Sequence, residues 1–375
     1  MSTFSYAIKM AIILFPIVSL IFTIPYIIYQ YHKYGSINPY RTIIIYSFLL
    51  YLMSAYFLVI LPLPSIETVS KMTTPSYNLI PFHFISEIFS LSTFSVSDFA
   101  TYFPTLKNPV VYESIFNIFL TVPFGIYLHY YFEYDFKKTF FYSFCLTLFF
   151  ELTQLSGLYF IYPRGYRVFD VDDLILNTLG GILGYFIAYI PLKILPTRKK
   201  IDEQSKEKAN SVSILKRGMA FLIDFLIYSL FLASIIYLIH NFISNNFYLY
   251  LIILLIWTMI YYVILPNLLN GRTLAMKFFH LQFYSEKSVT WYRILAYYFW
   301  LVFIYVILPI LTLIIGYFLQ KEKIITKNAW EYYIIVTLAL TLMIYLILLL
   351  KRIFKIPTIN ENLSHVKIIS KIREN

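Results

Sequence analysis

The feature that most constrains this chain is a series of long apolar runs separated by short polar connections. A helix of about 20 apolar residues is long enough to cross the hydrocarbon core of a bilayer. We therefore predict nine transmembrane helices, at about 6–29, 41–62, 110–132, 138–161, 171–195, 214–240, 246–266, 292–319 and 330–351. Composition agrees, because 60% of the 375 residues are hydrophobic and 13% are charged, which excludes a soluble domain. The predicted fold class is an all-α polytopic membrane protein.

The basic residues of the chain predict its orientation. The formal net charge is +11, and most Lys and Arg residues lie in the connections between apolar runs. Because cytoplasmic loops carry the excess of Lys and Arg, we expect the N-terminus outside and the C-terminus in the cytoplasm. The connection that holds Lys321, Lys323 and Lys327 is the exception to this pattern. Orientation and contact with anionic membrane lipids account for the charge, so nucleic acid is not an expected partner.

A charged and polar stretch divides the chain into two predicted domains. The sequence LPTRKKIDEQSKEKANS at 195–211 has no apolar periodicity and is interpreted as a cytoplasmic linker at 196–211. A five-helix membrane domain at 1–195 precedes it. A four-helix membrane domain with a basic cytoplasmic tail follows at 212–375. Before the third span, Phe82, Ile85 and Phe89 recur at helical spacing, which predicts either an amphipathic helix on the outer surface or a lid over the bundle.

Polar side chains inside the first domain predict a functional pocket. Intramembrane polar groups are costly and are therefore candidates for function. Glu151 lies near the middle of the fourth predicted span, and Asp173 and Asn177 share one face of the fifth. Gly180 and Gly184 would let another helix approach closely, and a break at Pro123-Phe124-Gly125 is expected in the third span. The predicted pocket residues are Asn117, Glu151, Gln154, Arg164, Arg167, Asp170, Asp172, Asp173 and Asn177.

The aspartates at the start of the fifth span have a simpler explanation as well. Acidic side chains at a helix N-terminus cap backbone N–H groups, and Arg167 could pair with one of them. A divalent metal held by Asp170, Asp172 and Asp173 is a further alternative, although no cofactor is expected. The one cysteine, Cys145, excludes an intramolecular disulfide and a thiol-ligated metal site.

Four motifs occur in order in the first domain: NLIPF at 78–82, ESIFNIFLTVPFG at 113–125, FFELTQ at 149–154 and RVFDVDDLILNTLGGILGY at 167–185. Together they resemble the VanZ-like family, which is associated with resistance to the glycopeptide antibiotic teicoplanin. The resemblance implies a multi-pass protein of the bacterial cytoplasmic membrane. The characteristic positions that it implies are Asn117, Pro123, Gly125, Glu151, Gln154, Arg167, Asp170, Asp173, Asn177 and Gly181.

The second domain contains LKRGMAFLID at 215–224, with Arg217 and Asp224, and NGRTLAMKFFHLQF at 270–283. These two segments resemble a different family, the RDD membrane domain. Glu361 stands where the family's last aspartate is expected. Asp224 lies two turns inside its span and needs a buried partner, for which Arg272 and Arg293 are the candidates.

Three functions are compatible with these residues. The first is a binding protein whose outward pocket takes a lipid-linked cell-wall intermediate or a lipoglycopeptide and so affects susceptibility to glycopeptide antibiotics. In it, Arg164 and Arg167 would face anionic head groups. The second is a proton- or cation-coupled transporter that uses Glu151 and Asp224. The third, an enzyme with Glu151 as acid or base, is the least favoured because the chain lacks HExxH, GxSxG and a Gly-rich phosphate loop.

Overall fold

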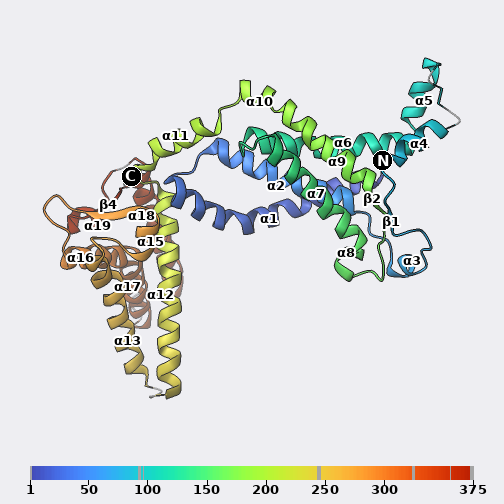
Figure 1. Cartoon of the computed structure of the whole chain (residues 1–375). Helices are drawn as coiled ribbons and strands as arrows, with labels where there is room; N and C mark the ends of the chain where they lie inside the picture. Colours follow the sequence, from blue (N-terminus) through green and yellow to red (C-terminus); the bar gives the residue numbers. More distant parts are fainter. Residues whose placement is uncertain are drawn as a thin grey trace. The chain divides into compact units, whose positions relative to one another are not determined.

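The computed structural model describes residues 2–91, 94–95, 97–242, 246–322, 326–354 and 356–371 (Figure 1). The chain is mostly helical and contains two small two-stranded sheets. Contacts divide it into two compact units, each described separately below. Unit 1 comprises Met1–Tyr26 and Ile37–Gln204, and unit 2 comprises Ile27–Ser36 and Ser205–Asn375.

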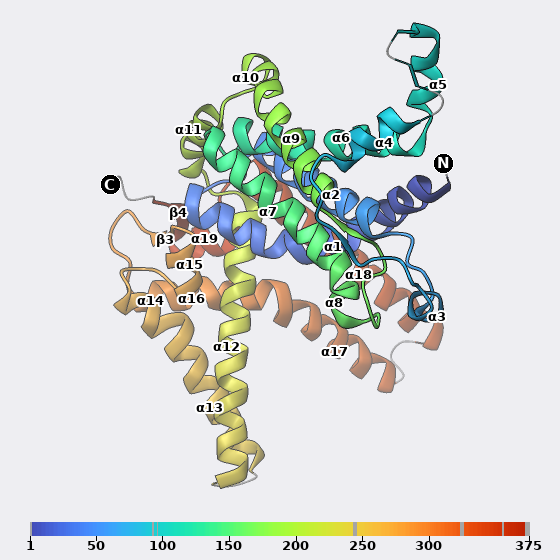
Figure 2. The same ribbon diagram turned by 45° about the vertical axis from the view of Figure 1, so that its right-hand side comes forward.

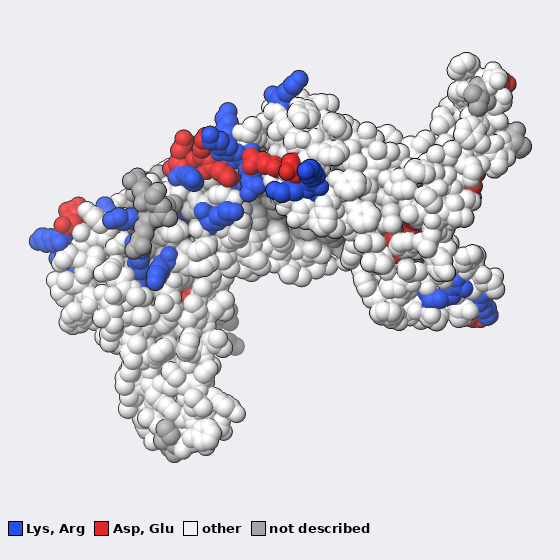
Figure 3. Space-filling model, viewed as in Figure 1, with Lys and Arg blue, Asp and Glu red and all other residues white. Residues whose placement is uncertain are grey.

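Eight helices in the described part of the chain are long and apolar enough to cross a membrane. They cover Ser5–Tyr34, Pro39–Ile60, Pro109–Tyr130, Val171–Ile194, Ile214–Phe242, Phe247–Leu268, Trp291–Lys321 and Tyr332–Ile353. Large apolar side chains are exposed along them, and Figure 3 shows almost no charge over α12 (Ile214–Phe242) and α13 (Phe247–Met259). A surface of this kind suits lipid rather than water. The protein is therefore a multi-pass membrane protein.

The fourth predicted span, at about 138–161, corresponds to a helix of different character. Instead of reaching residue 161, helix α7 covers Phe136–Leu155, and it is not among the eight apolar candidates. Its buried face carries Thr139, Ser143 and Thr147 followed by Glu151. These polar side chains lower the hydropathy of the segment. Eight of the nine predicted spans are therefore apolar enough to count as candidate membrane spans among the described residues.

Helices α6 (Pro109–Tyr130), α7 and α9 (Val171–Ile187) form the centre of unit 1. Figures 1 and 2 show them side by side, and each packs against the other two. The paired residues advance together along α6 and α9, so these two helices are parallel, whereas α7 runs antiparallel to both. Helix α2 (Pro39–Ile60) packs against α6 and α7.

Glycines allow the backbones of α6 and α9 to meet. A Cβ at Gly180 would lie 2.0 Å from the carbonyl oxygen of Ile118, and one at Gly184 would lie 2.1 Å from that of Val122. From the other side, a Cβ at Gly125 would lie 1.9 Å from the carbonyl oxygen of Gly181. The prediction that Gly180 and Gly184 permit a close approach is confirmed, and α6 is the partner.

The break predicted at Pro123-Phe124-Gly125 does not exist. Helix α6 continues through Pro123 to Tyr130. Gly125 serves interhelical packing instead of ending the helix, and a proline inside a membrane helix is tolerated where neighbouring helices support it.

The segment between α2 and α6 is built from short elements. They are α3 (Ile66–Ser70), β1 (Tyr77–Asn78), α4 (His83–Ser90), η1 (Phe99–Thr101) and α5 (Tyr102–Leu106). Strand β1 pairs in parallel with β2 (Phe169–Asp170), immediately before α9. The predicted amphipathic helix is present as α4, and its exposed apolar side chains include Phe89.

The predicted linker is mostly a helix, α11 (Arg198–Ala209), which follows α10 (Tyr189–Ile194). Ile201, Ser205 and Ala209 are fully buried at i, i+4, i+8 spacing. Only Ile201 in this stripe is a large apolar residue, so an apolar pattern does not reveal it. Within unit 1, Asp202 of α11 forms an ion pair with the buried Arg41 of α2.

Unit 2 joins its membrane helices to a small cap. The cap contains α15 (Leu274–Phe278), β3 (Leu281–Tyr284), α19 (Ile359–Ser364) and β4 (Lys367–Ser370), and β3 and β4 are antiparallel. The long helices are α12, α13 with α14 (Leu265–Leu268), α16 (Trp291–Val302), α17 (Leu308–Lys321) and α18 (Lys327–Ile353). Two π-helical turns, Ile260–Ile264 and Phe303–Ile307, overlap the same sequence, YVILP.

The glycine contacts predict a specific sensitivity. We expect Gly180→Ala to destabilise unit 1 by about 1–3 kcal/mol, because its methyl group must displace the backbone of α6. Thermal unfolding of the purified protein in detergent checks this as a lowered midpoint. Gly218→Ala on α12 is the matched control, because a Cβ there meets nothing within 4 Å. Equal midpoints for the two variants would contradict close packing of α6 and α9.

Candidate functional site

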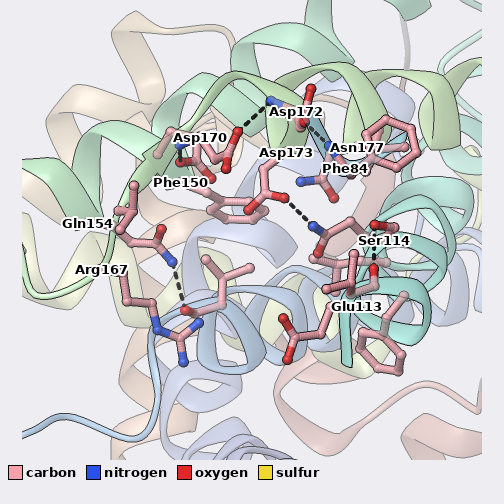
Figure 4. Close-up of a pocket in the computed structure, with 18 of the residues that line it drawn as sticks. Phe84, Glu113, Ser114, Phe150, Gln154, Arg167, Asp170, Asp172, Asp173 and Asn177 are labelled. Atoms are coloured by element: carbon pink, nitrogen blue, oxygen red, sulfur yellow. Dashed lines mark hydrogen bonds between the residues drawn. The ribbon is translucent and has the colours of Figure 1, made fainter. Parts of the chain in front are cut away.

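One cavity in unit 1 collects most of the polar residues singled out in the sequence (Figure 4). Its volume is about 640 Å³, and its walls come from α2, α4, α6, α7, α9 and the residues that precede α9. Eight of the nine predicted pocket residues line it: Asn117, Glu151, Gln154, Arg167, Asp170, Asp172, Asp173 and Asn177. The structure thus brings together residues that lie up to 60 positions apart in the sequence.

Asp170 has mainly a structural role. It is the N-cap of α9, where its Oδ1 accepts a hydrogen bond from the backbone N–H of Asp172 at 2.8 Å. Its Oδ2 accepts a hydrogen bond from the side chain of Asn78 at 3.1 Å, beside the β1–β2 pair. The alternative of helix capping is therefore confirmed for this aspartate.

Asp172 fastens α4 to the start of α9. Its side chain is 4% exposed, and its two oxygens accept hydrogen bonds from the backbone N–H groups of Phe82 and Phe84, the latter at 2.9 Å. Helix α4 has no side-chain cap of its own, and Phe82 adopts a left-handed conformation. The carboxylate of Asp172 thus supplies the missing acceptor from another helix. Because α4 also lines the cavity, this bond positions one wall of the site.

Asp173 and Asn177 connect α9 to α6 along one stripe. The side-chain amide of Asn117 donates to Oδ1 of Asp173, and the hydroxyl of Thr121 donates to the backbone carbonyl of Asn177. Asn177 is 4% exposed and lines the cavity, but its Oδ1 has no hydrogen-bond partner among the described residues. A buried acceptor of this kind costs free energy unless a donor reaches it.

Glu151 and Gln154 form the wall contributed by α7. Glu151 is 2% exposed, and its Oε2 accepts a hydrogen bond from the backbone N–H of Asp170 at 3.0 Å. Gln154 donates to the carbonyl oxygen of Val59 at 3.0 Å, near the end of α2. The shared face predicted for these two residues therefore points into the cavity, and Figure 4 shows the Gln154 bond.

Of the two arginines of the predicted pocket, one lines the cavity and the other does not. Arg167 lines the cavity and donates to the carbonyl oxygen of Leu61 at 3.2 Å, so the predicted pairing with an aspartate is not seen. Arg164 does not line the cavity. It binds the backbone carbonyls of Met72 and Thr74 and, at 3.0 Å, the hydroxyl of Ser76. Backbone carbonyls leave no sequence signal, which explains why Arg164 was misplaced.

Several cavity residues were missed. Helix α4 contributes His83 and Glu87, whose side chains are 3.6 Å apart, and α6 contributes Glu113 and Ser114. Figure 4 places Glu113 and Arg167 on the same side of the cavity, below Asp173. Glu113 opens the ESIFN motif, and three positions separate His83 from Glu87 on a predicted helix, so both signals were present in the sequence.

The aspartates do not converge on a metal. In the described parts of the chain, no group of three or more His, Cys, Asp or Glu side chains could hold a metal ion. The physical reason is that Asp170 and Asp172 direct their oxygens at separate backbone and amide donors, and Asp173 binds Asn117. These bonds point the three carboxylates in different directions.

The predicted polar residues of unit 2 have protein partners. Arg217 and Glu361 form an ion pair at 2.7 Å, and Glu361 also accepts a hydrogen bond from the backbone N–H of Thr358 at 3.0 Å. Burial acts to raise the pKa of Glu361, but the Thr358 bond and Arg217 outweigh it and hold that pKa below its ordinary value. The carboxylate therefore stabilises the cap in its ionised form.

Asp224 has hydroxyl and backbone partners rather than an arginine. It accepts hydrogen bonds from the hydroxyl of Tyr261 at 2.8 Å, from the hydroxyl of Thr273, and from the backbone N–H of Ala275 at 3.1 Å. The predicted partners bind elsewhere, Arg272 to Gln282 and Arg293 to Ser285. Asp224 thus holds the N-terminus of α15 against α12.

Comparison with known proteins identifies the first unit only. Residues 48–193 match the model of the VanZ/LLP1 family, and this range contains the whole cavity. The same comparison gives no evidence for an RDD domain in the C-terminal half. No curated protein and no solved structure matches the chain. The protein is thus a multi-pass membrane protein with a VanZ/LLP1 family domain at residues 48–193.

The bond between Asp172 and α4 is testable by hydrogen exchange. We expect Asp172→Ala to speed exchange of the backbone amides of Phe82 and Phe84 by about tenfold or more, because each loses a hydrogen bond to a charged acceptor. Mass spectrometry of the protein in nanodiscs measures this. Glu87→Gln, on the same helix, should leave those amides unchanged, because both donate to Asp172. Unaltered exchange in Asp172→Ala would show that α4 is held by something else.

Proposed function

We propose that this VanZ/LLP1-domain protein binds a component of the bacterial cell envelope in the unit 1 cavity and thereby affects susceptibility to glycopeptide and lipoglycopeptide antibiotics. The ligand class is a lipid-linked cell-wall intermediate or a glycopeptide-like molecule. The observation that carries the proposal is the gathering of eight predicted polar residues around one cavity of about 640 Å³ inside the matched domain. Cavities of this size accommodate small organic ligands.

We also propose that the cavity opens to the outside of the bacterial cytoplasmic membrane. Helices α6 and α9 are parallel and both are of spanning character, so the chain must return between them. Among the described residues, α7 is the helix of sufficient length there, since 20 residues rise about 30 Å. Nine crossings follow, and an odd number puts the two termini on opposite sides of the membrane. The excess of Lys and Arg in the C-terminal tail and the linker supports a cytoplasmic C-terminus, and with it an outer position for the Arg167–Asp173 end of α9.

Binding fits the site better than catalysis does. Two carboxylates that could serve an enzyme, Asp170 and Asp172, are engaged with donors of the protein. A metal-assisted reaction would need a convergent ligand set, and the described residues offer none. The remaining groups, Glu151, Asp173 and Asn177, suit recognition of hydrogen-bond donors.

A cellular assay tests the binding function. We expect Glu151→Gln, expressed in a bacterium that lacks its own copy, to lose most of the shift in teicoplanin susceptibility that the wild type confers. The reason is that an amide is a much weaker partner for a cationic or donor group, by about tenfold in affinity. Glu203→Gln is the control, because Glu203 is an exposed carboxylate of α11 away from the cavity. The proposal fails if both variants match the wild type at equal membrane levels.

Coupled transport is the second candidate, and one observation favours it. Thr139, Ser143 and Thr147 continue the stripe of Glu151 along α7, and each is fully buried with a hydroxyl that has no partner among the described residues. A column of hydroxyls beside a buried carboxyl group is a feature of proton and cation pathways.

Flux measurements decide on this second function. If the protein transports, vesicles that contain it should accumulate protons or cations, and Glu151→Gln should abolish the flux. Asp224→Asn in unit 2 should reduce the flux only if both units take part. Wild-type vesicles that behave as empty ones, under an imposed pH gradient and an imposed potential, exclude this candidate.

A further inference from the structure

The cavity is strongly acidic. Six carboxyl groups line it, while its basic side chains are one guanidinium, that of Arg167, and one imidazole, that of His83. The acidic residues are Glu87, Glu113, Glu151, Asp170, Asp172 and Asp173. A cation stabilises carboxyl groups gathered in a low-dielectric wall, whereas a phosphate group would add to their mutual repulsion.

The acceptors that remain for a ligand belong to two helices, α9 and α7. Oδ1 of Asp173 accepts a hydrogen bond from the Asn117 amide, so its Oδ2 is available to a ligand. Oε2 of Glu151 accepts a hydrogen bond from the backbone N–H of Asp170, so its Oε1 is available as well. Neither remaining oxygen has a hydrogen-bond donor among the described residues. Figure 4 shows the carboxylate of Asp173 directed toward the open centre of the cavity, with Glu113 on its lower side.

Asn177 supplies an independent indication of the ligand. Its buried Oδ1 has no protein donor among the described residues, although it lies one turn below Asp173 on the same stripe of α9. An amide oxygen can only accept. The missing partner must therefore be a donor, and an ammonium group offers three donors and no acceptor.

Part of the cavity wall is apolar. Leu58, Val59, Leu120 and Phe150 contribute to it, from α2, α6 and α7. A ligand that is cationic at one end and apolar at the other would satisfy both surfaces. Its ammonium end would neutralise buried carboxylates, and its hydrocarbon end would remove apolar side chains from water.

We infer that the cavity selects an amine-bearing amphiphile, with its ammonium group among Glu151, Asp173 and Asn177 and its hydrocarbon part against Leu58 and Phe150. This inference rests on the proposed binding function and narrows it to a cationic head group. It replaces the expectation that Arg164 and Arg167 select an anionic one. Arg164 lies outside the cavity, and Arg167 donates to the carbonyl oxygen of Leu61.

The test compares three probes of equal chain length on the full-length protein. Radiolabelled octylamine, octyl phosphate and octanol are equilibrated with the protein in neutral phosphatidylcholine nanodiscs, and empty nanodiscs provide the blank. We expect saturable binding of octylamine, weaker binding of octanol by about tenfold or more, and none of octyl phosphate above the blank. Octyl phosphate binding as tightly as octylamine would overturn the inference, and so would octylamine binding no better than octanol.

Matched variants locate the amine. Asp173→Asn keeps an acceptor oxygen for Asn117 but loses the charge, so it should weaken octylamine about tenfold and leave octanol unchanged. Glu113→Gln, at an exposed position of α6 that lines the cavity, should weaken octylamine binding less. Glu203→Gln should bind like the wild type. The same octylamine affinity in Asp173→Asn, Glu113→Gln and Glu203→Gln would refute the assignment of the amine to this cavity.

Failure of this inference is distinguishable from failure of the proposed function. If Glu151→Gln changes antibiotic susceptibility but octyl phosphate is the preferred probe, the cavity binds an envelope component of the opposite charge. If octylamine binds and Asp173→Asn loses it, while susceptibility is insensitive to Glu151→Gln, the ligand class stands and the cellular role does not.

Discussion

At Gly125, Gly180 and Gly184 the backbones of α6 and α9 approach so closely that a methyl group would overlap a carbonyl oxygen of the facing helix. Without a hydrophobic difference between lipid and side chain, such close packing is a main source of helix association in a membrane. It also sets the distance at which Asn117 reaches Asp173 and Thr121 reaches the backbone of Asn177. The polar stripe of α9 is therefore held in register by residues that have no side chains.

The carboxylates of the site divide into two groups by their partners. Asp170 and Asp172 bind donors of the protein and build the walls, since one caps α9 and the other holds α4. Glu151 and Asp173 line the cavity, and each uses one oxygen to accept a hydrogen bond from the protein. Burying several carboxyl groups together is unfavourable. A chain that carries such a cluster gains most from a ligand that brings positive charge.

The sequence predicted those features that depend on spacing along one helix. The i, i+4 relation of Asp173 and Asn177 and the shared face of Glu151 and Gln154 recur in the cavity wall, and the glycines beside them lie where α9 meets α6. Bonds to backbone atoms were not predictable, because carbonyl and N–H groups carry no residue identity. This explains the misplacement of Arg164, the unforeseen partners of Asp172 and the partners of Asp224. Helix α11 was missed because its buried stripe contains Ser205 and Ala209 rather than large apolar residues.

Helix α4 is held in place by its backbone N–H groups, whereas its side chains line the cavity. Asp172 contacts the N–H groups of Phe82 and Phe84, which any residue other than proline would also provide. The side chains at 83, 84 and 87 face the cavity without contributing to that anchor. Evolution or a protein engineer can therefore exchange them to suit a new ligand while the helix stays in place. Within this domain, substitutions on α4 can change ligand selectivity with the smallest loss of folding stability.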